Sequence, residues 1–126
     1  KIYDLSPITE PDIVVVLDHL LVEEANVVSG LKPGGLMIIN TSRKPSDYPF
    51  QGIRVAVADV THIAAKVGLP PGVVNTGIIG AFARAAQLLD IEDLAGAIEV
   101  EFNGKKPKRN ARSARVTYDQ TIIGGQ

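Results

Sequence analysis

Cysteine is absent from the 126 residues of the chain. This absence excludes disulfide bonds, catalysis by a thiolate, and iron–sulfur clusters held by cysteines of this chain, because each of these needs the sulfur of cysteine. It also agrees with a reducing compartment, and we expect a cytoplasmic protein. Any redox centre that works with this chain must therefore be bound by a partner.

An excess of charge of one sign and a long apolar run are absent as well. The formal net charge is −1, which gives no overall field that would attract nucleic acid or an anionic membrane surface. The longest apolar run covers residues 13–17 and is far shorter than the roughly 20 residues of a membrane-spanning helix. We therefore expect neither a nucleic-acid partner nor a membrane partner.

The composition and the length indicate one globular domain. Apolar residues make up 45% of the sequence and charged residues 21%, which is ordinary usage for a globular protein. A single core of this size can bury about two thirds of the surface that the unfolded chain exposes. The sequence therefore predicts one domain over residues 1–126.

Strand and helix patterns alternate along the chain. Short runs of aliphatic residues predict buried parallel strands at 11–18, 36–40 and 54–59,. Apolar residues at helical spacing predict helices at 19–31, 61–68 and 73–89, a helix that Asp90 caps and Gly104 ends, and one from 105 to about 120,. An irregular loop is predicted for 41–52. The alternation predicts an α/β fold, a three-layer α/β/α Rossmann-like sandwich with a largely parallel sheet.

Three strands are few for such a sheet, which in doubly wound folds has about five or more. The chain opens with Lys1, and its first strong element is already a buried strand. We therefore expect the N-terminal strand, its loop and a helix to lie upstream of Lys1, so that the domain is partial at its N-terminus.

No segment carries a complete catalytic or phosphate-binding motif. The glycines of residues 32–35 follow a predicted helix and precede a strand, which is the reverse of the order in Rossmann and P-loop motifs, and they are predicted to form a turn. Ser29, Ser42 and Ser113 lack the Gly-x-Ser-x-Gly setting of serine hydrolases,. We predict no catalytic residue in this chain.

His19, His62, Asp18 and Asp59 lie near the carboxyl ends of predicted strands, where open α/β sheets bind their ligands. The two carboxylates could act as an acid–base pair, but we favour capping and packing, since Asp59 precedes a helix and no further ligand stands at metal-binding spacing. We predict no metal site. The alternative function is a stand-alone nucleotide- or cofactor-binding module, whose crevice would include Asp18, Thr41 and Asp59.

Residues 105–115 contain six basic residues and no acidic one. Such a run can bind phosphates, nucleic acid or an acidic protein surface. Because the run lacks aromatic side chains that stack on bases, we interpret it as a solvated helix face or a salt-bridge surface between subunits.

Several segments together have the order and spacing of a known family. They are residues 12–18, 30–35, 38–41, 57–59 with 64–65, and above all 68–83, which read Gly-Leu-Pro-Pro-Gly-Val-Val-Asn-Thr-Gly-Ile-Ile-Gly-Ala-Phe-Ala. With them, the chain closely resembles the gamma subunit of 2-oxoacid:ferredoxin oxidoreductases. Residues 102–105 and 110–118 are similar to the closing helix of that subunit, so the resemblance covers nearly the whole chain.

The resemblance implies an enzyme class that includes pyruvate synthase. Such enzymes decarboxylate a 2-oxoacid on thiamine diphosphate, usually transfer the acyl group to coenzyme A, and pass electrons through [4Fe–4S] clusters to ferredoxin. It also implies that the alpha and beta parts bind thiamine diphosphate with Mg, and that a ferredoxin-like delta part, often with beta, holds the clusters. Alpha, beta and delta parts and an external ferredoxin are the expected partners, and this chain is expected to bind no cofactor itself.

The chain departs from the family pattern at its start. Gamma domains of the family open with a strand and a Gly-x-Gly-Gly-Gln-Gly-like loop, and nothing before Lys1 supplies them. The resemblance places the gamma part near the path of coenzyme A but assigns no residue to it. Pyruvate and other 2-oxoacids all stay open as substrates, because the substrate pocket of the family lies in the other parts.

The small residues of the segment 68–83 indicate close packing. We expect Asn75, Thr76, Gly77 and Gly80 to form a tightly packed helix start that faces a neighbouring element or a neighbouring subunit. A bulky residue in place of Gly77 or Gly80 would then overpack this contact and weaken assembly.

Overall fold

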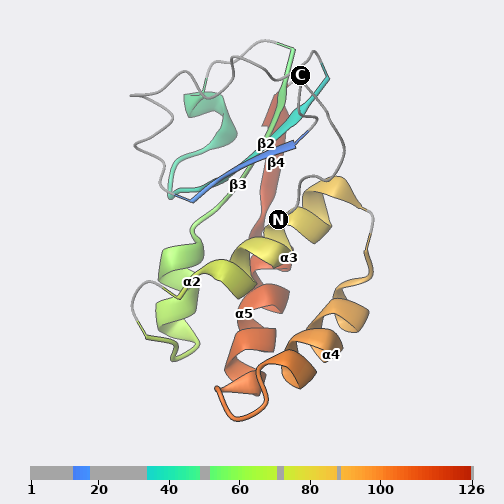
Figure 1. Ribbon diagram of the computed structural model, residues 1–126. Coiled ribbons are helices and arrows are strands. Elements are labelled where there is room, and N and C mark those ends of the chain that lie inside the picture. The colour runs from blue at the N-terminus through green and yellow to red at the C-terminus, as the bar shows by residue number, and fades with distance from the viewer. Residues whose placement is uncertain (1–12, 18–33, 49–51, 71–72, 88, 126) are drawn as a thin grey trace.

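A mixed β-sheet forms the upper part of the molecule in Figure 1. The computed structural model describes residues 13–17, 34–48, 52–70, 73–87 and 89–125. Within these ranges the strands are β1 (Ile13–Val16), β2 (Leu36–Asn40), β3 (Arg54–Ala58) and β4 (Ile122–Gly125). They are hydrogen-bonded in the order β1-β2-β3-β4. The pairs β1–β2 and β2–β3 are parallel, whereas β4 runs antiparallel to β3. The largely parallel sheet of an α/β fold is thus confirmed.

The two central strands are apolar on both faces because both faces are covered. Alternate side chains of β2 and β3 pack with Val16, Tyr48 and Ile53 on one face. The intervening side chains, among them Ile38 and Ala56, pack against the helices on the other face. This double burial explains the continuous aliphatic runs from which these strands were predicted.

The helices of the described chain are η1 (Pro45–Asp47, a 3₁₀ turn), α2 (Val60–Lys66), α3 (Asn75–Ala86), α4 (Ile91–Glu101) and α5 (Pro107–Gln120). Each predicted helix within the described ranges is present, with ends that differ by a few residues. Asp90 caps α4, since its side chain accepts hydrogen bonds from the backbone N–H groups of Glu92 and Asp93. The predicted helix over 19–31 lies outside the described residues.

Two features differ from the sequence prediction. The loop 41–52 contains η1, whose first residue is Pro45. The strand β4 was not predicted, because two isoleucines followed by two glycines form too short a pattern,. Its backbone is fixed by the free edge of β3, where Val57 pairs with Ile122. A strand made by such pairing leaves little trace in its own sequence.

The helices are stacked outward from the sheet. Helix α3 lies on β2 and β3, α5 packs along α3, and α4 packs on α5 (Figure 1). The contact of α3 with α5 is made by small residues. A Cβ on Gly80 would lie 2.9 Å from the carbonyl carbon of Ala114 and closer still to its oxygen. Only glycine permits this approach of the two helix backbones.

Candidate functional site

The carboxyl ends of β1, β2 and β3 meet at one edge of the sheet, and Asn40 connects them. Its amide nitrogen donates to the backbone oxygen of Leu17 at 3.2 Å and to the Thr61 hydroxyl at 2.9 Å. Its amide oxygen accepts from the backbone N–H groups of Val60 at 2.8 Å and Thr61 at 3.3 Å. Asn40 is buried, so these bonds satisfy its amide completely and fix the start of α2 against the sheet.

Thr41 anchors the loop that follows β2. Its backbone N–H donates to Ala58 at 3.0 Å, which extends the β2–β3 pairing by one bond. Its hydroxyl oxygen accepts from the Tyr48 hydroxyl at 2.8 Å and from the backbone N–H of Arg43 at 3.0 Å. Both Thr41 and Tyr48 are buried. The hydrogen bond from the Tyr48 hydroxyl therefore holds the loop against this edge of the sheet. It also gives the buried Tyr48 hydroxyl a partner.

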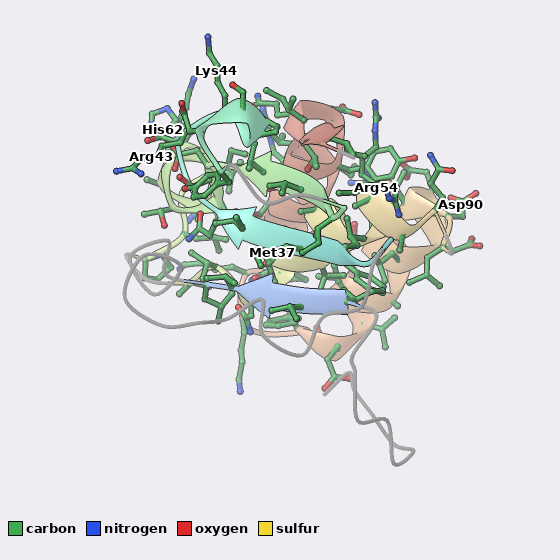
Figure 2. The ribbon with its side chains drawn as sticks, turned by 90° about the horizontal axis from the view of Figure 1, so that it is seen from above. Met37, Arg43, Lys44, Arg54, His62 and Asp90 are labelled. Carbon is green, nitrogen blue, oxygen red and sulfur yellow. The ribbon has the colours of Figure 1, made fainter. Side chains whose placement is uncertain are left out.

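Basic side chains surround the same edge. Figure 2 shows Arg43, Lys44 and His62 at the end toward which the arrows of β1 and β2 point, whereas Arg54 lies at the opposite end. Arg43, Lys44 and His62 are exposed. This edge can therefore attract an anionic group.

Asp59 directly follows β3 at this edge. The carboxylate of Asp59 accepts from the backbone N–H of His62 at 3.2 Å and so caps α2. Asp18 and His19 lie outside the described residues, so the acid–base pairing of Asp18 with Asp59 stays a hypothesis. Within the described ranges, no three His, Cys, Asp or Glu side chains gather closely enough to hold a metal ion. The capping role predicted for Asp59 is confirmed.

The residues predicted to form a close-packed helix start lie at the beginning of α3. Thr76 and Gly77 are buried, and the Thr76 hydroxyl donates to the side-chain oxygen of Asn110 on α5 at 2.8 Å. A Cβ on Gly77 would meet Val60 Cγ1 of α2 first and would lie 3.0 Å from Ser113 Oγ of α5, and Gly80 faces the backbone of α5 as described above. These three residues therefore face a neighbouring element of the same chain. Of the predicted four, only Asn75 is exposed, and a subunit interface here stays a prediction.

The basic run lies on α5 and divides into two parts. Arg115 donates to both carboxylate oxygens of Glu92 on α4, with the closest pair 2.9 Å apart. This hydrogen-bonded carboxylate raises the pKa of Arg115 above its ordinary value. This salt bridge lies inside the chain, and the salt-bridge surface between subunits stays a prediction. The residues Lys105, Lys106, Lys108 and Arg112 are exposed.

Sequence reasoning missed the role of Asn40. A polar residue that ends an otherwise aliphatic buried strand was the available signal, because a buried amide needs several hydrogen-bond partners. Its partners Leu17, Val60 and Thr61 are distant in sequence, and only the fold brings them together.

In the described part of the chain, no helix has both the length and the apolar character needed to cross a membrane.

Comparison with known proteins identifies the family. The model for the family "Pyruvate ferredoxin/flavodoxin oxidoreductase" matches residues 1–120. The common gamma subunit of the pyruvate/ketoisovalerate oxidoreductases of Thermococcus litoralis is 38% identical over 123 residues, which cover 94% of this chain and 65% of that protein. The pyruvate synthase subunit PorC of Methanocaldococcus jannaschii is 40% identical over 116 residues, which cover 91% of this chain and 62% of the relative.

A solved structure shows the same fold. The crystal structure of the pyruvate oxidoreductase subunit PORC of Thermotoga maritima has a TM-score of 0.78 and 26% sequence identity, and the match covers 92% of this chain and 66% of that one. The chain thus spans 65% and 62% of the length of the two sequence relatives above. The resemblance drawn from residues 68–83 and the shorter segments is confirmed, and the chain belongs to the pyruvate ferredoxin/flavodoxin oxidoreductase family.

Proposed function

We propose that the chain is a noncatalytic gamma subunit or domain of a thiamine-diphosphate-dependent 2-oxoacid:ferredoxin oxidoreductase. The family match and the gamma and PorC subunits among its relatives support this role. The noncatalytic part of the proposal rests on the polar side chains at the carboxyl edge of the sheet, which make structural hydrogen bonds. The side chain of Asn40 makes four structural hydrogen bonds, and the carboxylate of Asp59 caps α2. Both groups therefore have a structural role in the fold.

The donor atoms of the described residues and the lack of cysteine support the assignment of the cofactors to other parts of the enzyme. A cluster of the [4Fe–4S] type is held by cysteine thiolates, and the sequence has no cysteine,. A Mg ion with thiamine diphosphate needs several oxygen ligands, and no group of three carboxylate or histidine side chains lies together in the described ranges,. The proposal therefore assigns thiamine diphosphate and Mg to alpha and beta parts, and the clusters to a ferredoxin-like delta part with beta.

The reaction proposed for the assembled enzyme is the oxidative decarboxylation of pyruvate or a related 2-oxoacid. The acyl group would pass to coenzyme A and the electrons to an external ferredoxin. This chain contributes a rigid α/β body, whose large buried strands and closely packed helices present fixed surfaces to the other parts.

The proposal is tested by purifying the native protein through a tag on its C-terminus. We expect subunits of the enzyme to copurify, identified by mass spectrometry, together with the visible absorbance and the iron of cysteine-ligated clusters. These 126 residues contain no cysteine, so they cannot hold such a cluster, and we expect its iron to copurify with the other subunits. A colourless protein that purifies alone would contradict the proposal.

The exposed basic groups Arg43, Lys44 and His62 favour a second candidate, a stand-alone module that binds a nucleotide or another anionic cofactor at the carboxyl edge of the sheet,. Calorimetry of the purified chain with nucleotides, coenzyme A and thiamine diphosphate separates the two functions. Tight binding without partners supports the stand-alone module, whereas the gamma-subunit proposal expects none.

A further inference from the structure

The charges of α4 and α5 are arranged in opposite ways relative to their helix dipoles. The first turn of α4 carries Glu92 and Asp93, which the partial positive charge of a helix N-terminus stabilises. The first turn of α5 has no acidic residue, and its last turn has no basic one. Its basic residues stand instead at the N-terminal end, where the dipole repels them. The sequence of α5 therefore works against the stability of its own helix.

We define the basic start of α5 as the set of exposed residues at its N-terminal end and just before it, Lys105, Lys106, Lys108, Arg109 and Arg112. In Figure 1 the turn that joins α4 to α5 lies at the bottom of the molecule, at the end away from the sheet. The residues from Lys106 to Arg109 line an open depression on this end. The charges are thus concentrated on one accessible surface.

Two basic residues of α5 bind groups within the same chain. Arg115 binds Glu92 through both of its carboxylate oxygens, and Arg109 donates to the backbone oxygen of Gly68 at 3.2 Å. By contrast, Lys108 and Arg112 form no ion pair with any other described residue. They stand four positions apart on the helix and therefore project from the same face. Nothing in the described part of the molecule explains why both are basic.

Backbone geometry adds to the cost of this helix start. Lys106 has a left-handed conformation with φ +56°, which residues with a Cβ adopt rarely. The side-chain amide of Asn110 holds this turn by donating to the backbone oxygens of Lys105 at 3.1 Å and Lys106 at 3.0 Å. Glycine would relieve the strain, yet the sequence keeps lysine there. The charge placement and the left-handed turn each destabilise the start of α5. A contact outside the chain that offsets this loss would explain both.

We propose that the basic start of α5 is a docking surface for an acidic patch on another subunit of the same enzyme. This inference rests on the proposed function, because the partner is a part of the assembled oxidoreductase. Carboxylates of the partner would pair with Lys108 and Arg112 and would also neutralise the repulsion from the helix dipole. Docking therefore stabilises α5 as well as the contact.

The surroundings of the surface favour a protein over a nucleic acid. Helix α4, which packs on α5, carries the exposed carboxylates Asp93 and Glu101, besides Glu92, which Arg115 binds. These carboxylates repel a long polyanion that extends beyond the basic start of α5, whereas a bounded acidic patch with neutral or basic margins avoids them. Residues 105–115 also contain no aromatic side chain on which a base could stack,.

The variant Lys108→Glu tests the surface through two readouts that move in opposite directions. In the free chain, glutamate at the second position of α5 is favoured by the dipole and by Arg112 four positions later, so the thermal midpoint should rise. In the complex, the same glutamate faces the acidic partner and should weaken assembly. A residue with only a structural role inside the chain would move both readouts in the same direction.

The complex is captured through the C-terminal tag and washed at rising sodium chloride, and the salt concentration that releases the partner subunits is measured. For Lys108→Glu combined with Arg112→Glu we expect release at lower salt and an affinity about tenfold or more weaker near physiological salt. Arg54→Glu is the matched control, since Arg54 is an exposed basic residue that pairs with Gly125 in the sheet, whereas the turn that joins α4 to α5 lies at the end away from the sheet (Figure 1). A carbodiimide, which joins lysine to carboxylate without a spacer, should link Lys108 to an Asp or Glu of a copurified subunit.

The outcomes separate this inference from the proposed function. If partner subunits copurify but the double variant releases them at the same salt as the parent, the docking surface is wrong and the gamma-subunit role stands. If nuclease treatment releases what the parent captures, the surface binds nucleic acid and the inference is overturned. If the parent captures no subunit of the enzyme, both the inference and the proposed function fail.

Discussion

The centre of the sheet and the helix contact between α3 and α5 are both buried, yet they are packed by opposite means. The sheet core is made of large aliphatic side chains, among them Met37, Ile38 and Ile39, each with 0% of its surface exposed. The α3–α5 contact is made of Gly77, Gly80 and other small residues that bring the two backbones together. A core of large side chains is sensitive to lost volume, whereas a contact of small ones is sensitive to added volume. We therefore expect different effects from adding volume to the α3–α5 contact, removing volume from the sheet core, and removing a hydroxyl from the α3–α5 contact.

The largest effect is expected for Gly80→Leu. The first atom of the new side chain would meet the carbonyl group of Ala114, and this obstacle is backbone that no rotamer change removes. We expect a loss of about 4 kcal/mol or more in the free energy of unfolding, above the usual range for overpacking. Urea denaturation followed by circular dichroism measures it.

Gly96→Leu is the matched control for that substitution. Gly96 lies in the middle of α4, is exposed, and a Cβ there meets nothing within 4 Å. Leucine should therefore raise the stability by about 0.5–1 kcal/mol through helix propensity alone. Equal losses at both positions would show that the α3–α5 contact has no special sensitivity to volume.

Ile38→Ala should have the next largest effect, because it removes volume from the sheet core. Ile38 is buried among residues of β2, β3 and α3, and the cavity left by alanine is expected to cost about 3 kcal/mol. Ile38→Leu, which conserves the volume, should cost less than about 1.5 kcal/mol. If Ile38→Ala lowered the free energy of unfolding no more than Ile38→Leu does, α3 would have to move onto the sheet and fill the cavity.

Thr76→Val keeps the shape of the side chain but removes its hydroxyl. The side-chain oxygen of Asn110 then loses its donor in a buried site, and we expect a loss of about 1–2 kcal/mol. Thr76→Ser, which retains the hydroxyl, separates the hydrogen bond from the methyl contact. If serine destabilises more than valine does, packing and not the hydrogen bond holds α3 to α5 at this point.

Among the changes at the α3–α5 contact, the smallest effect is expected for Ser113→Ala, and it is a gain in stability. Ser113 is fully buried, and its Oγ has no hydrogen-bond partner among the described residues. Replacing a buried hydroxyl without a partner by hydrogen should raise the stability by about 1 kcal/mol. A calorimetric melt with a lower midpoint than the parent would show that the Ser113 hydroxyl is hydrogen-bonded in solution. The buried hydroxyl of Thr117 also has no partner among the described residues, so we expect Thr117→Val to shift the midpoint in the same direction as Ser113→Ala.

The same contrast explains how much of the fold the sequence predicts. The strands β2 and β3 and the Asp90 cap were predicted, because each is determined by residues adjacent in the chain. The strand β4 and the hydrogen bonds of Asn40 were not, because each depends on partners far away in sequence. The candidate site is therefore less predictable than the core, since its geometry arises where separate strands end.

The close packing of α3 was predicted, but its partner was left open between an element and a subunit. Composition alone indicates that a helix with Gly77 and Gly80 approaches another backbone. It does not indicate which backbone, because Ala114 lies in a helix that the α4 segment separates from α3 along the chain.

The place of β4 has a consequence for synthesis on the ribosome. The strand β3, with Val55, Ala56 and Val57, leaves the ribosome before α2, α3, α4 and α5, and among the described residues its outer edge pairs with β4. Until β4 arrives, the nascent chain presents an apolar strand with unpaired backbone groups, which is a template for aggregation. Helix α5 leads into β4 after the single residue Thr121, so the helix docks and the sheet edge closes in one late step.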